Sequence, residues 1–131
     1  GGQGAPVAAG ALDAAVRCVA QCLRGDPACL GSGPALSGAL AALTGALAAG
    51  AEGPVGNAAL ALQVLASSEG NLEAMGAAGC VPTLLEVVHH RRGAGQRNAG
   101  LALARVVKRD ANMRQLRALH GVEILNAYLK I

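Results

Sequence analysis

The chain has 131 residues, enough for one domain, and its 53% hydrophobic and 15% charged residues argue against a disordered chain. Aromatic residues make up only 1%, and Ala and Leu dominate instead, which favours packed helices over strands. We therefore expect an all-α protein. Its net charge of +3 is uneven, because residues 89–131 carry nine Lys and Arg against two acidic residues while residues 1–88 carry a net −4. The positive field belongs to the last third of the chain.

Gly and Pro divide the first part of the chain into segments. Residues 1–10 read as a flexible lead-in, part tag or linker. A first helix is predicted over 11–24, a short helical turn over 28–30 and a further helix over 35–49. Because the first residue is not Met, we expect the chain to be part of a longer one.

The remaining chain repeats the order long helix, short helix, medium helix. Gly79 is expected to cap the short helix of the second unit. Loops are predicted at 50–53 and 91–95, and turns at 68–70 and 120–121. The predicted helices are 54–67, 71–78 and 81–90, then one ending near 109, 112–119 and 122–130.

Residues 57–90 recur at 98–131 with an offset of 41 and no gap. Core positions that differ between the two copies remain apolar. A helical period near 40 indicates a stacked solenoid of the armadillo or HEAT kind. The identical pairs include Asn57 and Asn98, Leu60 and Leu101, Asn71 and Asn112, Val81 and Val122, and Leu84 and Leu125.

Several of these segments resemble the armadillo repeat family. The segment 61–67 is similar to the end of its long third helix, 71–79 to its short first helix with the closing Ala-Gly, and 79–88 to its second-helix signature. The resemblance covers about 120 residues as units of about 11–50, 54–92 and 94–131. It implies an armadillo-like right-handed superhelical solenoid of about three repeats.

The resemblance also implies a concave groove, lined by third helices, that holds a partner segment. Many family members carry a Trp and an Asn there, whereas this chain has Leu60 and Val64, then Leu101 and Arg105. Asn57 and Asn98 are read either as groove residues or as helix N-caps. The candidate groove residues are Asn57, Leu60, Val64, Asn98, Leu101, Arg105 and Lys108.

Basic residues gather in the last third of the chain. Arg97, Arg105, Lys108 and Arg109 are predicted to share one helix, with the three arginines near a common face. The segment 89–92 reads either as an anion-binding loop or as an ordinary solvated one. The candidate basic patch is His89, His90, Arg91, Arg92, Arg97 and Arg109.

The four cysteines are expected to be reduced, buried packing residues in the cytoplasm or nucleus, because no secretory signal precedes them. The spacing of Cys18, Cys22 and Cys29 does not suit zinc, and no other metal or cofactor site is predicted. Cys80 beside His89 or His120 is the one conceivable nucleophile arrangement, and we expect no enzyme.

The longest uncharged run, residues 27–51, raises the question of a membrane span. Its leucines recur at steps of three and four, which is typical of a core helix with one apolar face. We therefore expect no transmembrane segment. The leucines of this stripe are Leu36, Leu40, Leu43 and Leu47.

Together these features predict a protein–protein interaction scaffold or adaptor. Its partner would be a peptide or helix, with acidic segments favoured by the basic third unit. Self-association through the apolar ends of the stack is a further expectation. The alternative is nucleic-acid or anionic-lipid binding through residues 89–117, although the chain has little aromatic surface for stacking on bases.

Overall fold

The computed structural model describes residues 25–26, 33–49 and 52–130. The predicted lead-in 1–10, helix 11–24 and helical turn 28–30 lie outside these residues, as do Cys18, Cys22 and Cys29.

Every regular element in the described part of the chain is helical, which confirms the all-α prediction. Gly79, in the left-handed region at φ 82°, separates a short helix from α5 as the sequence predicts. The elements are α2 (Pro34–Ala49), α3 (Glu52–Leu65), η2 (Glu69–Asn71), α4 (Leu72–Ala77), α5 (Cys80–His90), α6 (Gly93–Val106), α7 (Asp110–Ala118) and α8 (Gly121–Lys130).

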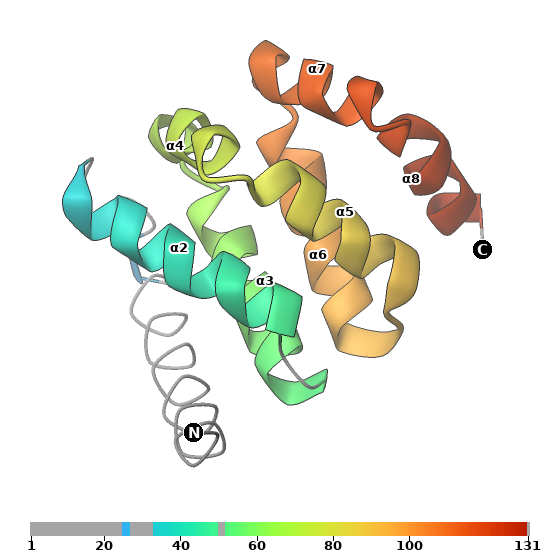
Figure 1. Ribbon diagram of the computed structural model, residues 1–131, viewed down its shortest axis with the longest axis horizontal. Coiled ribbons are helices and arrows are strands. Elements are labelled where there is room, and N and C mark those ends of the chain that lie inside the picture. The colour runs from blue at the N-terminus through green and yellow to red at the C-terminus, as the bar shows by residue number, and fades with distance from the viewer. Residues whose placement is uncertain (1–24, 27–32, 50–51, 131) are drawn as a thin grey trace, which may run out of the picture.

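The helices fall into two units of the same order, α3–α4–α5 and α6–α7–α8, preceded by α2. Corresponding helices contact each other: α3 packs on α6, α5 on α8 and α4 on α7. In Figure 1, α2, α5 and α8 lie side by side in one layer, with α3 and α6 behind them. Helices that are 41 residues apart in the sequence are thus stacked on each other in the structure.

One hydrophobic core joins these helices. The four leucines of the α2 stripe are buried against it, as their spacing predicts. Ala contributes to this core as well, because Ala58 and Ala59 of α3 and Ala99 and Ala102 of α6 are buried, and these two helices pack on each other. Within the described residues, no helix is long and apolar enough to cross a membrane.

Two predicted loops are shorter than expected. The helix α3 already begins at Glu52, and α6 begins at Gly93, although Gly-rich segments normally indicate loops. Close packing explains the second case. Gly95 is buried, and a Cβ built on it would lie 3.2 Å from Val55 Cγ1, so a side chain there would require Val55 to shift by a few tenths of an ångström.

The repeat extends to buried side-chain hydrogen bonds. Asn71 Nδ2 donates to the Leu65 carbonyl at 3.0 Å, and Asn112 Nδ2 makes the equivalent bond to Val106 at 3.0 Å. Asn112 Nδ2 also donates to the Leu72 carbonyl at 2.9 Å, which ties α7 to the preceding unit. The Asn112 amide therefore forms one hydrogen bond within its own unit and one to the preceding unit.

Candidate interaction surface

An apolar cavity of about 310 Å³ opens between α6 and α8; we call it the α6–α8 cavity. Leu101 is 51% exposed here, and Arg97 is the charged residue of the lining. The ring of Tyr128 packs closely on Gly100, because a Cβ built on this glycine would lie 3.1 Å from Tyr128 Cε2. The lining residues are Arg97, Gly100, Leu101, Ala104, Leu125 and Tyr128.

The position of this cavity within the repeat explains why it is open. Of the residues 41 positions earlier, Ala59, Leu84 and Val87 are buried, and Gly56, Leu60 and Gln63 are half-buried. Each residue that lines the α6–α8 cavity is thus more exposed than its counterpart in the second unit. An exposed apolar hollow of this kind is typical of a binding site.

The structure places most of the candidate groove residues on the adjoining helices α3 and α6. Asn98 Nδ2 donates to the Gly56 carbonyl at 3.3 Å, and Arg105 Nη1 donates to the Gln63 carbonyl at 2.9 Å, so both side chains hold α6 against α3. Leu101 alone among the candidates lines the α6–α8 cavity. The others are Leu60, Val64 and Asn57, which are half-buried on α3, and Lys108, which is exposed after α6.

The N-cap interpretation of Asn57 and Asn98 is wrong. The helix α3 begins at Glu52 and α6 at Gly93, so both asparagines lie inside a helix, more than one turn beyond its start. The interpretation failed because it placed both helix starts too late in the sequence. The side chain of Asn98 instead bonds the neighbouring unit.

The predicted arginine wall is also wrong. Because α6 ends at Val106, Lys108 and Arg109 are not on its surface. Arg97 lines the cavity beside α8, whereas Arg105 reaches back to α3 and Arg109 Nη2 pairs with Glu73 Oε2 of α4 at 3.2 Å. The basic residues are therefore distributed over several contacts rather than forming one anion-binding face.

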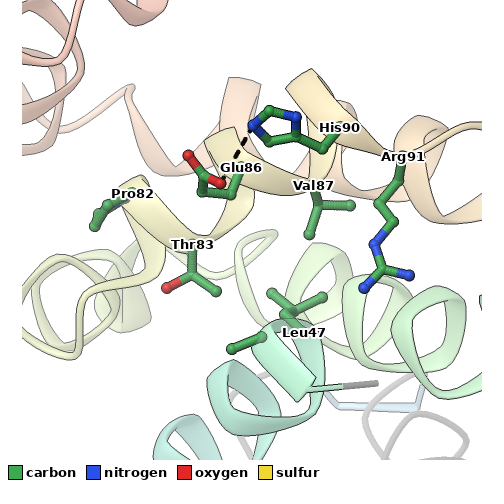
Figure 2. A pocket seen from close by; sticks show the side chains of 8 residues that line it. Leu47, Pro82, Thr83, Glu86, Val87, His90 and Arg91 are labelled. Atoms are coloured by element: carbon green, nitrogen blue, oxygen red, sulfur yellow. Dashed lines mark ion pairs between the residues drawn. The ribbon is translucent and has the colours of Figure 1, made fainter. Parts of the chain in front are cut away.

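The segment 89–92 is divided between two cavities that sequence reasoning missed. His90 and Arg91 line a cavity of about 470 Å³ between α2 and α5, the α2–α5 cavity, shown in Figure 2. His89 and Arg92 line one of about 300 Å³ between α5 and α8, the α5–α8 cavity. The 41-residue offset relates residues that line the first cavity to residues that line the second, and this is the sequence signal for a repeated cavity.

Cys80 is fully buried at the start of α5, and burial raises the pKa of its thiol to about 12. The thiol is therefore protonated at neutral pH, which suits a packing residue better than a nucleophile. Among the described residues, no group of three or more His, Cys, Asp or Glu is placed to hold a metal ion.

The raised pKa of Cys80 predicts a pH dependence of stability. Above pH 9 the unfolded thiol loses its proton while the folded thiol keeps it, so this group destabilises the fold as pH rises from 9 toward 12. The expected slope is about 1.4 kcal/mol per pH unit. Urea denaturation at pH 8 to 10.5 should show this slope in wild type and a flatter one in Cys80→Ala; equal slopes would contradict the assignment.

Comparison of the chain with protein-family models, curated proteins and solved structures gave no match. The functional argument therefore depends on the geometry of this surface and on the repeat.

Proposed function

We propose that the chain is an armadillo-like interaction module that binds a segment of a protein partner on its third unit. Three agreements support the repeat on which this depends: the 41-residue offset in sequence, the matching order of α3–α4–α5 and α6–α7–α8, and the equivalent bonds of Asn71 and Asn112. A stack of such units presents extended surfaces to partners.

The observation that carries the proposal is the exposed Leu101 beside the α6–α8 cavity. An apolar side chain of the partner would enter between Leu101, Leu125 and Tyr128, where burial of apolar area supplies the affinity. Arg97 lies at the same cavity and would pair with a carboxylate of the partner. The net +7 of residues 89–131 would speed the approach of an acidic segment.

The chain contains a matched pair of leucines for the test. Leu101 and Leu119 are both exposed, at 51% and 43%, but only Leu101 lines the α6–α8 cavity. We expect a partner captured by the wild-type chain to bind Leu101→Asp at least about tenfold more weakly, while Leu119→Asp binds as wild type. The affinities would be measured by calorimetry with the purified partner, at equal helical content by circular dichroism.

The same series separates this function from charge-driven binding. If the captured ligand is nucleic acid or anionic lipid, its affinity should fall steeply with salt and respond equally to both leucine substitutions. That result would refute the proposed cavity-based recognition. Equal loss of a protein partner with both variants would show that the α6–α8 cavity is not its binding site.

A further inference from the structure

The side of α6 that lines the α6–α8 cavity is equivalent, in the repeat, to a side of α3 on which a helix already packs. Four lining residues on α6 stand at steps of three, one and three, so they share one side of that helix. They are Arg97, Gly100, Leu101 and Ala104, and their equivalents 41 positions earlier on α3 are Gly56, Ala59, Leu60 and Gln63.

The helix α6 contacts this side of α3 toward both ends. The Asn98 side chain, in the first half of α6, donates to the Gly56 carbonyl at 3.3 Å, and a Cβ built on Gly56 would lie 3.9 Å from the backbone nitrogen of Gly95. Near the end of α6, Arg105 Nη1 donates to the Gln63 carbonyl at 2.9 Å. Because the early residues pair with each other and the late residues do the same, α6 runs in the same direction as α3.

The third unit differs from the second at both ends of this side. Arg97 replaces Gly56, and its long side chain keeps a further helix more distant from the start of α6 than α6 is from α3. Ala104 replaces the longer Gln63, and Leu125 of α8 lines the cavity together with it. A helix packed here in the same direction would therefore have room for a large apolar side chain beside Ala104 and would place a polar one beside Arg97.

We propose that the segment bound at the α6–α8 cavity is an amphipathic helix of another protein, which packs parallel to α6 as α6 packs on α3. The inference rests on the proposed function and specifies the form of its partner. The known contact between α3 and α6 supplies the geometry, and the cavity of about 310 Å³ supplies the space for one large apolar side chain. The bound helix would be anchored as in other helix-in-groove complexes, by apolar residues on one side.

The charge of the cavity fixes what the start of the bound helix must carry. Arg97 is the one charged residue among the described residues of the lining, and its side chain forms no ion pair with another described residue. A parallel helix would bring its N-terminus, with the positive end of its dipole, toward Arg97. Asp or Glu in its first turn would offset both charges. The large apolar residue should follow about four or seven positions later, on the same side.

A second copy of the chain does not supply such a helix from its described residues. Their exposed large apolar side chains are Leu101 itself and Leu119. Leu119 follows α7, which begins with Asp110 but carries Arg114 and Arg117 on its exposed side between that residue and the leucine. These two positive charges would be repelled by the basic third unit. We therefore assign the helix to another protein.

The test is a selection on the immobilised 131-residue chain from two display libraries. One library randomises an exposed helix side of a stable three-helix miniprotein, and the other contains random linear peptides. Binders that Leu101→Asp weakens at least about tenfold, and Leu119→Asp does not, should come from the helix library. Their sequences should carry Asp or Glu in the first turn and a large apolar residue about four or seven positions later.

The two libraries separate the helical form from the proposed function. Leu101-dependent binders that come from the linear library alone, and that tolerate a central Pro, would overturn the helical form and leave the proposed function standing. Absence of Leu101-dependent binders from both libraries would overturn both. Ala104→Trp should weaken a selected helix at least about tenfold, because it fills the cavity. Ala111→Trp, at an exposed position of α7 outside the lining, should bind as wild type.

Charge reversal tests the direction of the bound helix. Arg97→Glu should weaken a selected helix about three- to tenfold, and Lys in place of its first-turn acidic residue should restore the affinity. Arg114→Glu changes the net charge equally on the exposed side of α7 and should have no such effect. Rescue from the last turn instead of the first would show an antiparallel helix and overturn the proposal. A dimer in analytical ultracentrifugation that Leu101→Asp dissolves would identify a second copy as the occupant and would also overturn it.

Discussion

Replacing Asn112 with Ala is expected to lower the free energy of unfolding by roughly 2–3 kcal/mol. The Asn112 side chain is 2% exposed, and its amide donates to two buried carbonyls, one in its own unit at Val106 and one in the preceding unit at Leu72. Ala leaves both carbonyls without this donor and opens a void between the units. Urea denaturation monitored by circular dichroism measures the change.

Asn126→Ala is the matched control, since Asn126 is exposed on α8 and its replacement should change stability by less than about 0.5 kcal/mol. A similar small effect at both positions would mean that the Asn112 bonds do not hold the units together. A typical domain is stable by about 5–15 kcal/mol, so we expect the Asn112→Ala chain to remain folded and measurable.

Gly76→Ala is expected to destabilise the protein by about 2–3 kcal/mol, for a related reason. Gly76 is buried in α4, and a Cβ built on it would overlap the Asn112 carboxamide. The added methyl group would push that side chain away from its carbonyl partners. Gly45→Ala is the control, because Gly45 lies in α2 with open space around its Cβ position, and there Ala should stabilise by roughly 0.5–1 kcal/mol.

The substitutions Gly76→Ala and Asn112→Ala should also be coupled. Because the methyl group added at position 76 would overlap the Asn112 side chain itself, removing that side chain should relieve most of the cost of Gly76→Ala. The double-mutant cycle should therefore give a coupling of about 1–2 kcal/mol. Additive effects would place the strain of Gly76→Ala elsewhere.

The sequence was sufficient for the features that depend on local pattern and on the repeat. The spacing of the leucines in α2 predicted which face of this helix is buried. The glycine at position 79 predicted the residue with left-handed backbone before α5. The 41-residue offset predicted two units with the same order of helices, because two segments with similar apolar patterns and turn residues form similar helices. Leu101 was named as a groove residue from the resemblance to the armadillo family, and the structure leaves it exposed at the α6–α8 cavity.

Features that depend on contacts between helices could not be predicted in this way. The start of α6 in a Gly-rich segment reflects the close approach of Gly95 to Val55, which no local pattern reveals. Arg105 was assigned to a partner, but its reach to the Gln63 carbonyl depends on how α6 lies against α3. The division of His89 to Arg92 between two cavities likewise needs the positions of α2, α5 and α8.

The central claim, that a partner segment docks at the α6–α8 cavity, is tested most directly by site-specific photo-cross-linking. A photoreactive residue at position 101 is compared in cells with the same residue at position 119, since both sites are exposed leucines. We predict that one protein cross-links from position 101 and not from 119, through a short segment with an apolar residue beside Asp or Glu. Cross-links of equal yield and identity from both positions, or from neither, would contradict the account.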